Sequence, residues 1–293
     1  MRALWISFAG LMLTAVGQAV VVAFSGSVAL LGDTVHNFAD ALTAVPLAIA
    51  FVLGRRAASR RFTYGLGRSE DLAGLVILMI MAGSAVLACW EAVDRLVQPQ
   101  LMRNIGWVAA AAVVGFVGNE WAARYRIRVG RQIGSAALIA DGLHARTDGF
   151  TSLAVLLAAG GAWIGWSWVD AAVGLVITAA ILSVLYGAAK EVFARVLDAV
   201  DPALMDTAEH TLGDTRGVLA IETLQMRWVG HQLHAETNLV VAPALSVVAA
   251  HAIAVEAEHR LRHALPRLIA VTVHTDPACS PAETDPHAVL AHH

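Results

Sequence analysis

Two eight-residue segments share one spacing of aspartate and histidine, D-x-x-H-x-x-x-D, in runs of apolar sequence. The spaced residues are Asp33, His36 and Asp40 in the first segment, and Asp141, His144 and Asp148 in the second. The histidines are 144 − 36 = 108 residues apart. Positions i, i+3 and i+7 lie on one side of an α-helix, so each segment presents one polar face.

Two such faces turned toward each other make a cage of two imidazoles and two carboxylates. The predicted ligands are His36, Asp40, His144 and Asp148. A tetrahedral set of this kind suits Zn2+, with Cd2+ as a surrogate. Co2+ and Ni2+ also accept imidazole and stay open, whereas a set made mainly of aspartates would favour Mn2+ or Fe2+.

The remaining charged residues of the motifs have other expected roles. Asp33 and Asp141 either orient the histidines by hydrogen bonding or line a water-filled cavity. Arg146 points away from its motif neighbours on a helical wheel, which favours a salt bridge or an interfacial position over metal binding.

The elements that carry the motifs have the length of membrane spans. The chain has 293 residues, of which 58% are hydrophobic and 15% charged, and its mean hydropathy is +0.65. Six apolar runs approach the ~20 residues that cross a bilayer. They cover residues 4–24, 28–53, 74–93, 106–123, 135–159 and 166–188. These runs predict a six-transmembrane-helix bundle. Ionisable residues inside a membrane, such as those of the motifs, are costly and mark functional sites.

Arginines set the expected orientation of the bundle. Five arginines lie between the second and third runs and four between the fourth and fifth, and the other connections are poorer in them. The positive-inside rule then puts both termini in the cytoplasm. The net charge of −3 indicates no nucleic-acid partner.

The sequence after Lys190 is more polar and predicts a small α+β domain. Helical patterns cover 203–212 and 246–265, and strand patterns cover 218–229, 231–241 and 268–274, with Gly230 at a hairpin turn. The predicted domains are residues 1–195 for the membrane bundle, 196–280 for a cytoplasmic αββαβ domain and 281–293 for a disordered tail.

Taken together, these features resemble the cation diffusion facilitators, a family of zinc and other divalent-metal/proton antiporters, in their bacterial form. The resemblance rests on the paired H-x-x-x-D motifs, Gly26-Ser27, Y-G-L-G-R-S-E at 64–70 and V-H-T-D-P at 273–277. It covers nearly the whole chain. It implies a homodimer in the cell (inner) membrane, with a ferredoxin-like cytoplasmic domain that binds metal and dimerises.

The resemblance also implies a second metal site in the cytoplasmic domain. The matching positions are Glu222, His234, His251, His274 and Asp276, where glutamate stands in place of a histidine ligand of some relatives. The alternative for each histidine is an ordinary surface position.

A charge pair is implied between Arg68, which is a lysine in some relatives, and Asp198 near the end of the sixth span. Such a pair would act as a pivot between protomers. The alternative is an ordinary juxtamembrane arginine.

Three classes of function remain to be weighed on the sequence alone. A metal exporter that returns protons fits best, because a metal must displace protons from its ligands and imidazole changes charge near neutral pH. An intramembrane metalloenzyme would need an open coordination position and a general base, and the H-E-x-x-H pattern is absent. A membrane-anchored metal sensor leaves the mid-membrane motifs unexplained. The expected protein is therefore a transporter and not an enzyme.

Overall fold

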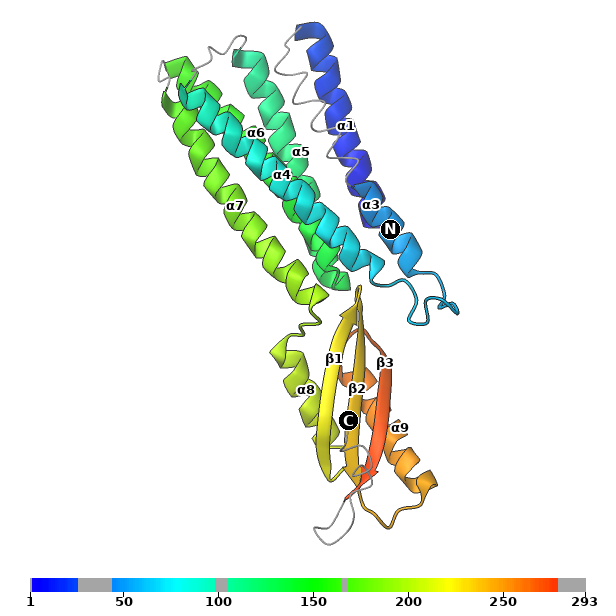
Figure 1. Ribbon diagram of the computed structural model, residues 1–293. Helices are drawn as coiled ribbons and strands as arrows, with labels where there is room; N and C mark the ends of the chain where they lie inside the picture. The colour runs from blue at the N-terminus through cyan, green and yellow to red at the C-terminus, as the bar shows by residue number, and fades with distance from the viewer. Residues whose placement is uncertain (1, 26–43, 98–104, 165–167, 279–293) are drawn as a thin grey trace. The chain divides into compact units, whose positions relative to one another are not determined.

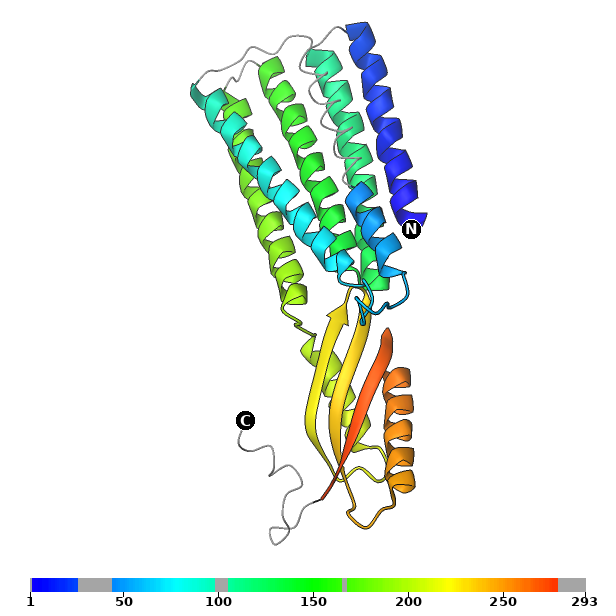
Figure 2. The same cartoon turned by 45° about the vertical axis from the view of Figure 1, so that its right-hand side comes forward.

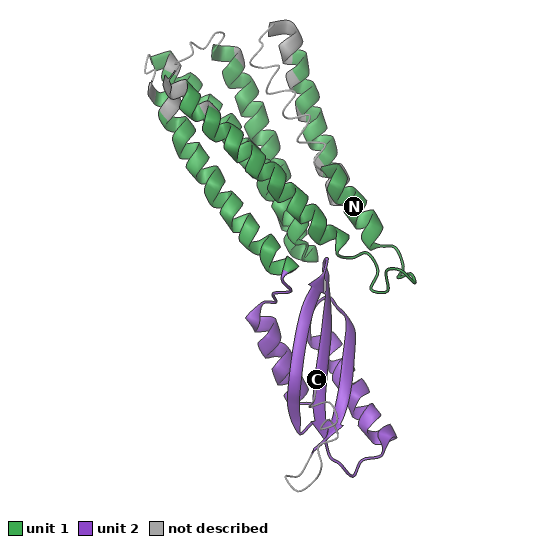
Figure 3. Ribbon diagram, in the orientation of Figure 1, with its two compact units in different colours: residues 1–196 green, residues 197–293 purple. Residues whose placement is uncertain are grey.

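The protein forms two compact units, residues 1–196 and 197–293 (Figure 3). The computed structural model describes residues 2–25, 44–97, 105–164 and 168–278. The first motif, with Asp33, His36 and Asp40, lies outside the described residues, as does the tail predicted to be disordered.

The first unit is a bundle of helices that run side by side (Figures 1 and 2). Its described helices are α1 (Arg2–Ser25), α3 (Ala44–Gly54), α4 (Ser69–Val97), α5 (Ile105–Ile133), α6 (Ala136–Ile164) and α7 (Trp168–Val196). Helix α6 packs against α5, α7 and α4, and its inner residues join one apolar core with Leu47 of α3, Ile77 of α4 and Val192 of α7. The motif-bearing helix therefore has neighbours on several sides.

Two described helices contain stretches long and apolar enough to cross a bilayer, Ser69–Asp94 and Ala172–Val196. Helix α6 carries three charged residues, Asp141, Arg146 and Asp148, within eight residues. Many large apolar side chains of the bundle are exposed, among them Leu87, Trp90 and Val176. Apolar side chains on the outside of a helix bundle fit lipid as the surrounding solvent.

Helix α5 is longer than its apolar run. The arginine-rich segment 124–131, which the apolar pattern leaves between two spans, is helical to Ile133. Only Gly134 and Ser135 separate α5 from α6, and Gly134 adopts φ +70°, a conformation that suits glycine at a tight turn. Arg126 is buried, so it does not act as an exposed cytoplasmic charge. Arg126 is therefore not among the exposed arginines on which the predicted orientation depends.

The second unit has the predicted order αββαβ. Its elements are α8 (Pro202–Gly213), β1 (Ala220–Val229), β2 (Gln232–Val241), α9 (Val247–Ala264) and β3 (Leu268–Pro277). Asp201 caps α8 by accepting a hydrogen bond from the Ala203 amide, and Ser246 caps α9 in the same way from Ala249. The turn between β1 and β2 includes Gly230 at φ +61°, as the hairpin prediction requires.

The sheet has the strand order β1-β2-β3, with β1 antiparallel and β3 parallel to β2. Odd-numbered β2 residues such as Leu233 and Leu239 are buried against Leu212 of α8 and Leu261 of α9. The even-numbered residues of β2, including His234, lie on the opposite face. Strand β3 extends three residues beyond the predicted 268–274, which brings Asp276 into the sheet.

Candidate metal site

The second motif forms a buried polar pair on α6. The Nδ1 atom of His144 lies 3.6 Å from the Oδ1 atom of Asp148, and the two side chains are 1% and 3% exposed. They are four residues apart, one helical turn, so they lie one above the other on the same side of the helix. Of the four predicted cage residues, the structure describes His144 and Asp148, and His36 and Asp40 lie outside the described residues.

Local hydrogen bonds fix where α6 begins and how the motif segment is held. The buried Ser135 hydroxyl accepts a hydrogen bond from the Leu138 amide at 3.1 Å, a helix N-cap. Two threonine hydroxyls donate back to backbone carbonyls, Thr147 to His144 and Thr151 to Asp148, each at 2.7 Å. Hydroxyl groups that donate in this way have a hydrogen-bond partner within their own helix.

Asp141, the first residue of the motif, forms an ion pair with Arg126 of α5. The Nη1 atom of Arg126 lies 2.9 Å from Oδ2 of Asp141, and the side chains are 1% and 0% exposed. Removal of one partner from a buried ion pair destabilises a protein by about 3–5 kcal/mol, because the other charge is left uncompensated. The pair therefore joins α5 to the start of the motif.

Sequence reasoning missed Arg126 as a partner, although a signal for it exists. Gly134 marks the turn of an antiparallel helix pair, and Arg126 precedes it by 8 residues while Asp141 follows it by 7. Opposite charges at nearly equal distances from such a turn meet across the helix interface. The apolar pattern gave no reason to extend α5 that far.

A second ion pair joins the same two helices. Arg146 Nε lies 3.3 Å from Oε2 of Glu120, and Arg124 lies 2.7 Å from Oε1 of that glutamate. Of the two roles expected for Arg146, a salt bridge or an interfacial position, the structure shows the salt bridge. Asn119, also missed from the sequence, is a buried amide whose Cβ lies 3.5 Å from where a Cβ on Gly149 would stand.

Glycines allow α5 and α6 to approach closely at two levels. A Cβ on Gly142 would stand 3.0 Å from the Ile127 amide nitrogen and 3.1 Å from the Arg126 Cβ. A Cβ on Gly130 would stand 3.0 Å from the Ile139 amide nitrogen. Backbone atoms cannot move aside as a flexible side chain can, so these two positions require glycine at this helix spacing.

The predicted cytoplasmic ligands are only partly brought together. His274 Nε2 and Asp276 Oδ1 are 3.0 Å apart on β3. His234 pairs in register with Arg227 and Ala270, whereas His274 pairs with Asn238. Four residues along β2 separate His234 from that level, roughly 13 Å.

The other two predicted ligands lie elsewhere in the same unit. Glu222 is at the β-bulge of β1, and His251 is exposed on α9. In the part of the chain that the structure describes, no group of three or more His, Cys, Asp or Glu side chains is arranged to hold a metal. The five residues are therefore not gathered into one site within a single protomer.

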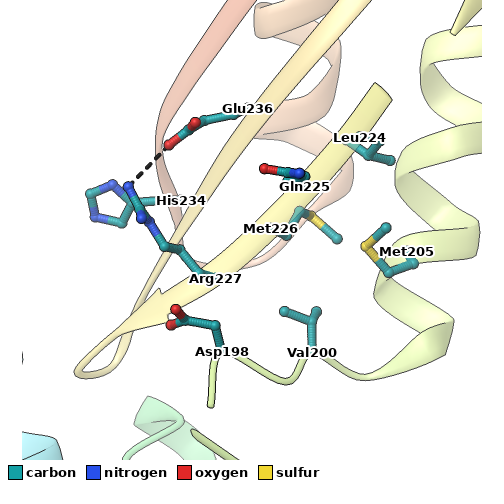
Figure 4. Close-up of a pocket in the computed structure, with 9 residues that line it drawn as sticks. All are labelled: Asp198, Val200, Met205, Leu224, Gln225, Met226, Arg227, His234 and Glu236. Carbon is teal, nitrogen blue, oxygen red and sulfur yellow. Dashed lines mark hydrogen bonds and ion pairs between the residues drawn. The ribbon is translucent and has the colours of Figure 1, made fainter. Parts of the chain in front are cut away.

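A pocket of about 420 Å³ lies at the edge of the cytoplasmic sheet (Figure 4). Its lining residues are Asp198, Val200, Met205, Leu224, Gln225, Met226, Arg227, His234 and Glu236. Across it, Arg227 Nη2 lies 3.0 Å from Oε1 of Glu236. Asp198, which adopts φ +60°, belongs to this second unit and Arg68 to the first, so their charge pair stays a prediction.

The pKa of His234 lies below its ordinary value of 6.5. Partial burial is the main cause, because it disfavours the charged imidazolium. The positive charge of Arg227 lowers the pKa further, and the carboxylate of Glu236 acts in the opposite direction.

Each of the two units matches a domain known from other proteins. Residues 4–197 match the profile of the cation efflux transmembrane domain, and residues 200–278 match that of the cytoplasmic domain of cation efflux proteins. A probable cation efflux system protein of Mycobacterium tuberculosis is 58% identical over 277 residues, covering 94% of this chain and 83% of the relative. Metal tolerance protein 2 of Oryza sativa is 27% identical, covering 88% of this chain and 74% of the relative.

Among solved structures, a nickel form of the MamM CTD is similar in structure. The match covers 27% of this chain and 100% of the MamM chain, at 20% sequence identity and a TM-score of 0.26.

These matches define an integral membrane transporter with a cytoplasmic C-terminal domain. The chain belongs to the cation efflux family, the cation diffusion facilitators. It is a divalent-cation efflux transporter and not an enzyme, and its second domain is of the dimerisation type, which implies a homodimer. The metalloenzyme and sensor alternatives are therefore set aside.

The low pKa of His234 predicts a pH dependence of stability in the cytoplasmic unit. The unfolded chain binds a proton at this histidine near pH 6.5, whereas the folded unit binds it only at lower pH. Stability should therefore fall as the pH is lowered from about 6.5 toward the folded pKa. We expect the Tm of a metal-free fragment 197–278 to decrease over this window, and His234→Gln to flatten that decrease.

The matched control is His259→Gln, at an exposed position of α9. It should retain the wild-type slope of Tm against pH. An unchanged slope in His234→Gln would show that another group causes the dependence.

Proposed function

We propose that the protein exports Zn2+ from the cytoplasm through a site formed by His36, Asp40, His144 and Asp148. One observation carries the proposal: in a cation efflux protein, His144 and Asp148 are buried, 3.6 Å apart, on a helix packed among other helices. An imidazole and a carboxylate on one side of the same helix supply nitrogen and oxygen ligands for a divalent ion. An identical H-x-x-x-D motif at His36 supplies the other two by sequence.

The preference for Zn2+ follows from the proposed ligand types. Two imidazoles and two carboxylates in a tetrahedron favour Zn2+, and Cd2+ has similar requirements. Co2+, Ni2+, Fe2+ and Mn2+ are the alternative substrates, with Mn2+ least suited to a site half made of imidazole. Flux of each metal into proteoliposomes ranks them directly.

Replacement of either proposed aspartate ligand should abolish transport. Asp148→Ala and Asp40→Ala each remove a charged ligand from a four-ligand site, and we expect Zn2+ flux to fall to the level of protein-free liposomes. The measurement is Zn2+ uptake into proteoliposomes with purified, folded dimer. Asp206→Ala, at an exposed position of α8, is the control that should transport normally. Near-normal flux in either ligand variant would reject the proposed site.

We also propose that proton return drives export. A metal binds only when its ligands have released their protons, so the loaded and empty carriers differ in proton content. In the empty carrier a proton on His36 or His144 would offset part of the negative charge of the two aspartates inside the membrane. Metal would therefore leave the cytoplasm as at least one proton enters.

Proton coupling predicts that an imposed pH gradient drives uphill Zn2+ movement. We expect Zn2+ to accumulate against its gradient in proteoliposomes with a proton gradient of opposite direction, and accumulation to stop when an ionophore collapses that gradient. A pH-sensitive dye should report proton movement that depends on Zn2+. Accumulation that persists after collapse would contradict antiport.

The cellular setting follows the same line of argument. The protein would lie in a bacterial inner membrane, as its mycobacterial relative supports. Both termini would lie on the cytoplasmic side, as the arginine-rich 55–68 connection supports. The homodimer would be held in part by the cytoplasmic domains.

For the cytoplasmic unit we propose a regulatory metal site that includes His274 and Asp276. Their 3.0 Å contact supplies two ligands, and the open face of the sheet also carries His234. Ligands from both protomers of the dimer would complete coordination, which accounts for the dispersed positions within one chain.

Zn2+ should therefore raise the Tm of the dimer, because a ligand that binds only the folded state stabilises it. The double variant His234→Ala/Asp276→Ala should lose this shift and keep some flux, since neither residue belongs to the proposed transport site. His259→Ala is the control that should keep the shift. If the wild-type cytoplasmic fragment shows no Zn2+-dependent change in Tm, the proposed regulatory site is excluded.

A further inference from the structure

The described carboxylates of α5 and α6 are divided between two kinds of partner. The two helices contain three acidic residues, Glu120, Asp141 and Asp148. Glu120 and Asp141 each contact arginine, whereas Asp148 contacts His144. Two carboxylates are thus neutralised by guanidinium groups, and the third lies beside the imidazole of the motif.

We propose that Arg126 is a specificity-determining residue of transport, because it withholds the Asp141 carboxylate from the metal. The proposal rests on the transport site proposed above. Asp141 is three residues before His144, so both lie on the same side of α6. Without a cationic partner, Asp141 would add a negative charge and two oxygen ligands at the edge of the site.

The contact is held by the packing of the helix backbones. A Cβ at Gly142 would stand 3.1 Å from the Arg126 Cβ and 3.0 Å from the Ile127 amide nitrogen. The residue after Asp141 therefore touches the backbone that carries Arg126. The guanidinium reaches Asp141 at 2.9 Å in a place where both side chains are removed from solvent.

The chemistry of the pair gives the direction of the effect. With Asp141 held by Arg126, α6 offers the metal one imidazole and one carboxylate, from His144 and Asp148. A released Asp141 would make the set richer in oxygen and in negative charge. Oxygen-rich, anionic sites favour Mn2+ over Zn2+ relative to sites with more imidazole. Arg126 therefore acts through Asp141 and does not touch the metal.

The test compares initial rates of Zn2+ and Mn2+ flux in proteoliposomes of the full-length protein. The variants are Arg126→Gln, Asp141→Asn and the double variant Arg126→Gln/Asp141→Asn. We expect Arg126→Gln to lower the Zn2+/Mn2+ rate ratio about 10-fold, the size of effect that residues supporting metal ligands have. Asp141→Asn and the double variant, which lack the carboxylate, should keep the wild-type ratio even if their absolute rates fall.

The matched control is Arg128→Gln, an arginine on the same helix with an exposed side chain. It should keep both the rates and the ratio. A merely structural role for Arg126 would reduce both metals equally and leave the ratio unchanged. That result, or a ratio as low in the double variant as in Arg126→Gln, would overturn the proposal.

Arg126→Lys covers the case in which Arg126→Gln does not fold. Lysine keeps the positive charge but lacks the planar fork of donors that grips a carboxylate, so the ratio should fall part of the way. A wild-type ratio in folded Arg126→Lys, when Arg126→Gln is unfolded, would also overturn the proposal. Failure of the transport site is separate: it would appear as Zn2+ flux that survives Asp148→Ala, whatever Arg126 does.

Discussion

Charge buried in a medium of low dielectric constant is the constraint on which the transmembrane unit depends. A transporter of cations needs carboxylates inside its helices, yet each uncompensated charge there destabilises the fold. The structure meets both needs by giving the carboxylates different kinds of partner. Glu120 and Asp141 are matched by arginine, and Asp148 lies beside the imidazole of His144. The ionic groups that hold the helices together are thereby kept apart from those proposed to bind the substrate.

The two units solve different packing problems by different means. In the bundle, glycines at 130 and 142 let backbones approach, and polar groups close the interface. In the cytoplasmic unit, leucines from two helices and the central strand make an apolar core on one face of the sheet. Its other face carries His234, Glu236, His274 and Asp276, which gives that unit a polar surface supported by a rigid layer.

Much of the architecture could be predicted from local patterns. The order αββαβ, the hairpin at Gly230 and the start of a helix at Ser246 follow from periodicity and turn chemistry, which act over a few residues. The direction of Arg146 on a helical wheel indicated a salt bridge or an interfacial position, and the contact with Glu120 decides between them. Arg126 was missed because its partner is set by the pairing of two helices, and hydropathy ends α5 several residues too early. The cytoplasmic ligands were predicted as a set, but strand register separates His234 from His274, and register is a tertiary property.

The tight contact of α5 with α6 has a kinematic consequence. Helices whose backbones meet at Gly130 and Gly142, with a buried ion pair between these levels, cannot slide or rotate past each other without breaking that pair. In a transport cycle that keeps this pair intact, α5 and α6 would move together. Relative movement of helices would then occur where α6 contacts α4 and α7, because these contacts are less extensive than its contact with α5. A joint rotation of the two helices would be centred near the short turn at Gly134 and Ser135 that connects them.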